Sequence, residues 1–260
     1  MLSEPTKAIK KRNNEFFKHI SSNKFINKNS LNSSNPFTQY NRKKQFRLMI
    51  ENIKPKFDDK ILVVGVGSGR EIKIISDYVR KVYGVDISKK FLKHCEKKFG
   101  DNFEGSHCDI ETEKVIYDDE YFDKIVCINV LPYFGKEGLK NYFNEMARVM
   151  KKDGTMFIMI LNKRFPFSEE IQRNMIRDRL KANKAIYFFH NLEYYSEIFN
   201  KYGLFIKYTE GGIIYTSTNS RLDKVVCNQH LRTIIINLMN WGGKTPLKNY
   251  YKNLYLLLNK

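Results

Sequence analysis

The stretch that decides the fold is ILVVGVGSGREIKIIS, residues 61–76. Four apolar residues come first, glycines follow at every second position, and a sequence with helical spacing comes last. A buried strand, a glycine turn and a helix are the first parts of a nucleotide-binding half-domain. Glycine lets the backbone approach a ligand closely, and the start of the helix supplies free N–H groups. We therefore expect a ligand to lie against Gly65, Gly67 and Gly69.

An acidic residue follows at the distance that such a half-domain requires. The second expected strand, 81–86, ends in Asp86, 17 residues after Gly69. A carboxylate there can accept hydrogen bonds from both ribose hydroxyls, which favours an adenosine-type ligand. The dinucleotide motif G-x-G-x-x-G fits poorly, because Arg70 occupies the position of its third glycine. A Walker loop is excluded, since no GK[ST] follows the glycines.

Apolar runs alternate with helical patterns along the chain, which is typical of an α/β domain with a mostly parallel sheet. Residues 204–218 predict a β-hairpin that turns at Gly211-Gly212, and the last forty residues have a helical pattern. The other expected strands are 60–65, 81–86, 103–107, 122–129 and 154–161. The expected helices are one that begins after Ser88, and 137–151, 168–182 and 191–202.

Composition limits the class of protein. Hydrophobic residues make up 42% of the 260-residue chain, enough for a sizeable core. Because neither an apolar run of membrane-spanning length nor a secretory signal is visible, we expect a cytoplasmic protein with no transmembrane segment. The four cysteines lack a CxxC pair, so we expect neither a disulfide framework nor a metal site.

The net charge of +18 is concentrated at the N-terminus, where residues 1–47 carry eleven Lys or Arg and two Glu. The simplest interpretation is a solvated basic arm. Attraction of an anionic substrate, a membrane surface or RNA is the alternative.

Five segments, in order, resemble the motifs of class I S-adenosylmethionine-dependent methyltransferases of the small-molecule type. They are VVGVGSGRE, VYGVDIS, HCDIE, FDKIVCINVLPYF and LKNYFNEMARVMKKDGTMFIMI. The resemblance covers about residues 45–218. It implies a doubly wound, mostly parallel, seven-stranded Rossmann-like sheet with a C-terminal β-hairpin and added helices. It also implies S-adenosyl-L-methionine as cofactor and S-adenosyl-L-homocysteine as product.

The domain organisation that follows from the resemblance has three parts. Residues 1–44 are expected to form a basic arm or helix that covers the active site. Residues 45–218 are expected to form the cofactor-binding domain, with a lid insert at 162–190. Residues 219–260 are expected to form a helical C-terminal extension, which covers the core, forms a dimer contact or lies on a membrane.

The resemblance also assigns cofactor contacts. It implies that the glycines line the methionine and ribose part, that Asp86 holds the ribose, and that Asp109 contacts the adenine amino group. One departure is Val63, because the family often has an acid two residues before the first glycine; Glu71 is the candidate that replaces it. The full expected set is Gly65, Gly67, Gly69, Glu71, Asp86, Ile87, Cys108, Asp109, Ile110, Asn129, Val130, Leu131 and Tyr40.

Acceptor residues are expected on the segments that the family places around the methyl group. His190 is the candidate base, because the unperturbed pKa of histidine lies near neutrality. Packing beside the helix start at Asn191 is the competing interpretation of His190. Tyr133 is the second candidate catalytic residue. The wider set is Tyr40, Tyr133, Asn162, Lys163, Tyr187 and His190.

The predicted function is methyl transfer to an O or N atom of a small or medium-sized acceptor. Basic residues in the insert favour an anionic acceptor, such as a sugar, a sugar nucleotide, a phosphorylated metabolite or a lipid headgroup, whereas a solvated helix face is the simpler interpretation for most of them. These residues are Lys163, Arg164, Arg173, Arg177 and Arg179. An RNA methyltransferase is the alternative, supported mainly by the basic charge. Asn129-Val-Leu-Pro-Tyr133 contains the elements of an adenine-amino motif one residue too far apart, and this segment is more similar to that of small-molecule methyltransferases. A third hypothesis is a non-catalytic partner protein with the same fold. The expected assembly is a monomer or a homodimer.

Overall fold

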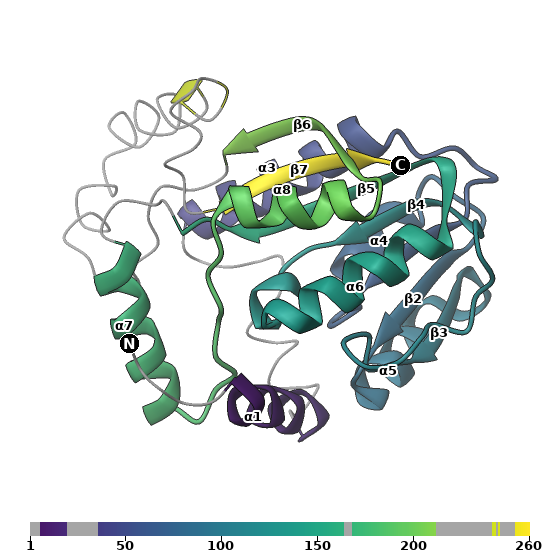
Figure 1. The fold of residues 1–260 in the computed structure, drawn as a ribbon. Helices are drawn as coiled ribbons and strands as arrows, with labels where there is room; N and C mark the ends of the chain where they lie inside the picture. The colour runs from purple at the N-terminus through teal and green to yellow at the C-terminus, as the bar shows by residue number, and fades with distance from the viewer. Residues whose placement is uncertain (1–5, 20–35, 164–167, 212–240, 243, 245–252) are drawn as a thin grey trace.

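The structure is a computed structural model that describes residues 6–19, 36–163, 168–211, 241–242, 244 and 253–260 (Figure 1). Seven strands form one sheet in the order β3-β2-β1-β4-β5-β7-β6. Strands β1 to β5 pair in parallel, and β7 is antiparallel to both of its neighbours. The strands are β1 (Ile61–Val64), β2 (Val82–Asp86), β3 (Phe103–His107), β4 (Phe122–Cys127), β5 (Met150–Leu161), β6 (Phe205–Gly211) and β7 (Asn253–Asn259).

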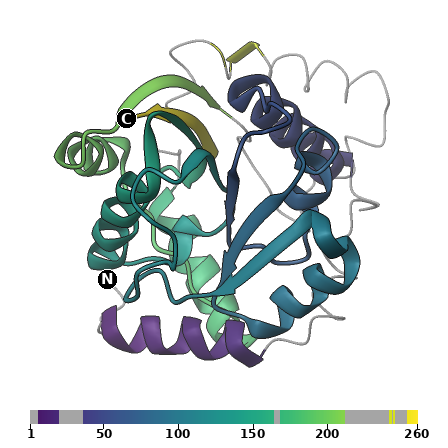
Figure 2. The ribbon, with the colours of Figure 1, turned by 90° about the vertical axis from the view of Figure 1, so that its right-hand side faces the viewer.

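Helices cover both faces of the sheet, so the expected doubly wound α/β fold is confirmed (Figures 1 and 2). Helices α3, α4 and α5 contribute to the core on one face, and α6 and α8 contribute to the core on the other. The helices are α1 (Thr6–His19), α3 (Pro36–Ile53), α4 (Arg70–Ile75), α5 (Lys89–Phe99), α6 (Lys136–Val149), α7 (Ser168–Lys181) and α8 (Leu192–Lys201), with short 3-10 helices η1 (Gly100–Asn102) and η2 (Leu131–Tyr133).

Strand β1 has a continuous apolar run rather than an alternating pattern, because helices cover both faces of the sheet at this strand. All four of its residues are buried. Ile61 and Val63 pack with α3, α4 and α5, whereas Leu62 and Val64 pack with α6 and α8. A parallel sheet that is covered on both faces requires apolar residues at every position.

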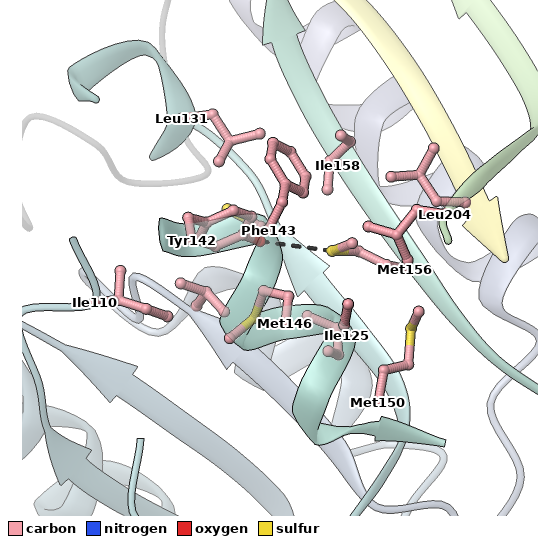
Figure 3. Packing of buried hydrophobic residues seen from close by; sticks show 14 of the residues in the cluster. Ile110, Ile125, Leu131, Tyr142, Phe143, Met146, Met150, Met156, Ile158 and Leu204 are labelled. Carbon is pink, nitrogen blue, oxygen red and sulfur yellow. Dashed lines mark hydrogen bonds between the residues drawn. The ribbon is translucent and has the colours of Figure 1, made fainter. Parts of the chain in front are cut away.

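The core beneath α6 is filled by large side chains from α6, from the neighbouring strands and from connecting segments (Figure 3). Tyr142 and Phe143 of α6 are fully buried, and Met156 of β5 lies opposite them. The Tyr142 hydroxyl donates a hydrogen bond to the Met156 sulfur at 3.6 Å, which gives this buried hydroxyl a partner.

Most expected element positions agree with the structure to within a few residues. Helix α8 starts where expected, and the Asn191 side chain accepts a hydrogen bond from the Tyr194 N–H at 3.1 Å. At α5, Ser88 occupies the N-cap position but its side chain forms no capping bond. Strand β4 ends at Cys127 rather than at residue 129, and Asn129 has a left-handed φ of 63° that ends extended structure.

The expected helical character of residues 219–260 is wrong for residues 253–259. This segment forms β7, which lies between β5 and β6. Its residues Leu254 to Leu258 are all buried. The sequence of this segment therefore lacks the alternation of apolar and polar residues that would distinguish a strand from a helix. Strand β7 is also the antiparallel partner of β6, whereas the second hairpin strand expected within residues 213–218 lies outside the described residues.

The expected boundary after residue 44 falls inside α3, which runs continuously from Pro36 to Ile53. Helix α3 packs against β5, β7 and α4, so it is part of the sheet domain. Helix α1 lies at the opposite end of the molecule from β6 in both views (Figures 1 and 2). In the part of the chain that the structure describes, no helix has the length and hydrophobicity needed to cross a membrane.

Candidate active site

A cavity of about 690 Å³ opens where β1, β2, β3 and β4 end. Its volume lies within the range of about 300 to 1,000 Å³ that is usual for small-molecule sites. The carboxyl ends of parallel strands are the general ligand position in open α/β sheets. Helix α1, helix α3 and the segment after α7 contribute further lining residues.

The glycine loop lines the cavity with two of its three glycines. Gly65 has φ +75°, and a Cβ atom there would lie 2.2 Å from Cγ2 of Val130, so only glycine fits. Gly69 has φ +74°, but it does not line the cavity; a Cβ atom there would lie 2.6 Å from the Phe99 ring of α5. The third glycine therefore allows close packing of α5 rather than contact with a ligand.

Asp86 lies at the end of β2 beside the glycine loop and is 9% exposed. Its carboxylate accepts hydrogen bonds from the backbone N–H groups of Gly67 at 3.1 Å and Ser88 at 2.8 Å. Burial raises the pKa of Asp86 to about 6, although these two bonds oppose the shift. The neighbouring Ile87 also lines the cavity.

The segment after β3 forms a second polar corner of the cavity, with Cys108, Asp109 and Ile110 in its lining. The Asn14 side chain, on α1, donates a hydrogen bond to Oδ2 of Asp109 at 2.9 Å. Nearby, Lys10 of α1 forms an ion pair with the buried Glu111 at 2.9 Å. Helix α1 is thus attached directly to this corner.

A third polar corner lies where α3 meets the start of α4. Glu71 is 5% exposed, and its Oε1 lies 3.6 Å from Arg70 Nη2 and 3.4 Å from Gln45 Nε2. Arg42 lines the same region; burial and the nearby Arg70 lower its pKa, and Glu71 opposes this shift. Val63 is 1% exposed and packs in the core under α3, so it does not belong to this polar corner.

Helix α1 and the segment after α7 line one side of the cavity and are joined by hydrogen bonds. The Asn13 side chain donates to the carbonyl groups of Tyr133 at 3.2 Å and Ile186 at 3.0 Å, and it accepts from the Ile186 N–H at 2.7 Å. Arg12 donates to the Leu180 carbonyl at 3.3 Å, which joins α1 to the end of α7 (Figure 1).

Comparison with known proteins agrees with this geometry. Residues 62–158 match the family model described as a methyltransferase domain. Over these residues the chain is similar to a methyltransferase domain, and its sheet has the Rossmann-like methyltransferase fold. Its matched segment covers β1 through most of β5, and therefore includes the glycine loop, Asp86 and Asp109.

Individual relatives of this methyltransferase domain are distant. The chain is 26% identical over 116 residues to YcgJ, an uncharacterized methyltransferase of Bacillus subtilis; the match covers 43% of this chain and 44% of the relative. The chain spans about half the length of the curated relatives it matches, 44% and 52%.

Solved structures share the fold at low sequence identity. A SAM-dependent methyltransferase of Leishmania major has a TM-score of 0.63 at 11% identity, with 98% of this chain and 85% of that chain covered. A chain from a methyltransferase–activator complex of Haloferax volcanii has a TM-score of 0.60 at 13% identity, with 92% and 97% covered. At these identities the likeness shows the fold alone.

S-adenosylmethionine is the cofactor that this methyltransferase domain implies, and the cavity fits it. The glycine-loop backbone at Gly65 and Gly67 lines the cavity and suits a nucleoside that approaches it closely. The buried Asp86 carboxylate and the corner of opposite charges at Glu71 and Arg42 suit its ribose and an amino-acid end. The expected contact residues that line the cavity are Gly65, Gly67, Glu71, Asp86, Ile87, Cys108, Asp109, Ile110, Asn129 and Val130.

Four expected site residues do not line the cavity of the methyltransferase domain: Gly69, Leu131, Tyr40 and His190. Leu131 is fully buried in the core beside α6 (Figure 3). Tyr40 lies on α3, where its neighbours Asn41 and Arg42 face the cavity instead.

His190, the candidate base, packs between other aromatic rings. Its ring centroid lies 5.2 Å from that of Tyr194 and 5.9 Å from that of Tyr195, and its Nε2 is 3.5 Å from the Phe134 carbonyl oxygen. Burial lowers the pKa of His190 to about 4. The competing interpretation, packing beside the start of α8, therefore describes its position, and we leave His190 out of the proposed catalytic residues.

Of the other acceptor candidates, Tyr133 and Tyr187 line the cavity, whereas Asn162 and Lys163 do not. Asn162 is buried in a bridge with His190, and Lys163 is exposed. Sequence reasoning did not identify several lining residues that come from distant segments, since no local pattern marks them. These residues include Asn13, Asn14, Arg42 and Gln45, whereas the lining residue Arg179 is one of the basic insert residues that the sequence analysis considered for an anionic acceptor.

Proposed function

We propose that the protein is an S-adenosylmethionine-dependent methyltransferase that acts on an O or N atom of a small or medium-sized acceptor. The observation that carries the proposal is the buried Asp86 carboxylate beside the glycine loop, at the cavity formed by the strand ends. A covered cavity of about 690 Å³ leaves room for an acceptor of limited size next to a cofactor.

Three corners of the cavity have the chemistry to hold the three parts of the cofactor. The Asp86 carboxylate would accept hydrogen bonds from the ribose hydroxyls. Asp109, with Cys108 and Ile110 beside it, would bind the adenine. Arg42 and Arg70 would bind the carboxylate of the methionine part, and Glu71 would bind its ammonium group, the contact that the family's acid at the position of Val63 would otherwise supply.

When bound, the cofactor supplies a methyl group that is activated by its sulfonium. The protein then has to orient the acceptor and exclude water. Helix α1 would exclude water through the contacts of Asn13 and Asn14, and Tyr133 would form one wall for the acceptor.

The proposal predicts that the purified protein binds S-adenosylmethionine or S-adenosylhomocysteine with micromolar affinity. Asp86→Ala should weaken binding by tenfold or more, because the carboxylate is lost, whereas the exposed Asp101→Ala should bind as the wild type does. Titration calorimetry measures both. Absence of binding of either ligand to the wild type would contradict the proposal.

The two other hypotheses give different results in a transfer assay with a methyl-labelled cofactor. An RNA methyltransferase would label RNA and would bind it at low salt. A non-catalytic partner protein would bind the cofactor and label neither RNA nor a metabolite pool. Label in the small-molecule fraction alone is the result that we expect.

A further inference from the structure

The part of the cavity beyond the cofactor corners is walled by three aromatic rings. Phe17 of α1 meets Tyr133 edge to face, with centroids 4.7 Å apart and an interplanar angle of 80°. Tyr133 in turn lies 5.0 Å from Tyr187, with their hydroxyl oxygens 3.4 Å apart. All three rings line the cavity. A wall of this kind favours a flat, largely apolar acceptor body.

A cation lies at the same wall. The Arg179 guanidinium lies over the Tyr187 ring, 4.0 Å from its centroid, and its Nε donates a hydrogen bond to the Ala185 carbonyl. Arg179 lines the cavity, and within the described part of the chain no carboxylate forms an ion pair with it. A guanidinium held in this way is prepared to bind an anionic group.

Among the described residues that line the cavity, no histidine and no unpaired carboxylate lies at this cation. Histidine is absent from the described residues that line the cavity, and the lining carboxylates are at the three polar corners. Asp109 is bonded to Asn14, and Glu111 is paired with Lys10. Burial raises the pKa of Tyr133 well above its usual value, so its hydroxyl stays protonated. An acceptor that needs no deprotonation therefore suits this wall best.

We propose that the acceptor is a carboxylate on a flat apolar body, bound by Arg179 against Phe17, Tyr133 and Tyr187, and that the product is its methyl ester. This inference rests on the proposed function. One carboxylate oxygen accepts a hydrogen bond from Arg179, and the other attacks the methyl carbon. The new C–O bond forms as the carbon–sulfur bond breaks, and the electron pair of that bond stays on sulfur. The negative and positive charges cancel, so no proton is transferred.

Binding tests the inference without turnover. Flat aromatic carboxylates, such as 2-naphthoate and indole-3-acetate, are titrated beside their neutral amides in the presence of S-adenosylhomocysteine. We expect at least one carboxylate to bind tenfold or more tightly than its amide. Arg179→Gln should remove this preference, whereas Arg173→Gln, an exposed position on the same helix, should keep it. Equal binding of every acid and its amide, or a preference unchanged in Arg179→Gln, would overturn the inference.

The bond that is formed gives a second readout. A methyl ester releases labelled methanol in mild alkali, whereas methylated phenols and amines keep their label. We expect alkali-labile label in the small-molecule product. Alkali-stable label would overturn this inference and leave the proposed function standing, whereas a chain that does not bind the cofactor would contradict the proposed function itself.

Discussion

At the scale of single residues, the burial of Asp86 conflicts with the charge that its proposed role requires. It is buried beside the glycine loop, which disfavours its charge, yet its proposed role requires a carboxylate. An unfolded chain has an Asp pKa of about 3.9. Between that value and about 6 the folded, cofactor-free protein binds the extra proton, so the contribution of Asp86 to stability falls as pH rises through this window.

Cofactor affinity should have the opposite pH dependence. Below pH 6 the Asp86 carboxyl must lose its proton before it accepts both ribose hydroxyls, so we expect affinity to fall by up to about tenfold for each further unit of pH. Above pH 6 this contribution should be constant. Calorimetric titrations between pH 5 and pH 8 measure the profile. In Asp86→Asn the affinity should be weaker and the break near pH 6 should disappear; a break that persists would assign it to another group.

At the scale of elements, α1 is held to the rest of the molecule by polar contacts at its inner face. Asn13 is 3% exposed and forms three hydrogen bonds that reach Tyr133 and Ile186. Loss of its side chain would leave three backbone groups unsatisfied, each at a cost of about 1–3 kcal/mol when buried. The contacts of α1 therefore depend strongly on one side chain.

Asn13→Ala should loosen α1 without unfolding the sheet. Hydrogen exchange followed by mass spectrometry should show exchange in residues 6–19 at least about tenfold faster than in the wild type, with the strands unchanged. Lys11→Ala, at an exposed position of the same helix, is the matched control. If α1 exchanged equally in Asn13→Ala and the wild type, other contacts would hold the helix.

Sequence reasoning identified residues of the cavity lining where these lie close together in the chain. Gly65 and Asp86 were found because a strand, a turn and a second strand place them within one local unit. The position of Asn13 could not be found in this way, because it depends on packing between segments more than 160 residues apart. Strand β7 was missed for a different reason: a strand buried on both faces has the same apolar composition as a buried helix.

At the scale of the whole molecule, a buried ion pair joins α3 to the far edge of the sheet. Lys44 Nζ lies 2.8 Å from Glu210 Oε1, and the two side chains are 1% and 0% exposed. Lys44 also donates to the Gly211 carbonyl at 2.8 Å, and Glu210 is bonded to the Tyr208 hydroxyl. The pair thus fixes α3, which carries Arg42 and Gln45, relative to β6.

Removal of one partner should be costly because it leaves the other charge buried and unpaired. We expect Lys44→Met to lower the free energy of unfolding by about 3–5 kcal/mol. The double variant Lys44→Met/Glu210→Leu should recover much of this loss, and Lys43→Met, at an exposed neighbouring position, should have little effect. Urea unfolding followed by circular dichroism measures all three. A double variant no more stable than Lys44→Met would indicate that packing, rather than charge, sets the cost.

The position of β7 also constrains how the molecule is made. Residues 253–259 form the strand between β5 and β6, although both of these neighbours are synthesised before it. Before β7 is synthesised, the edge of β5 that β7 later pairs with is therefore unpaired. Strand β6 also lacks the strand that joins it to the sheet. A nascent chain in this state exposes strand edges that can pair wrongly with other chains until β7 is made.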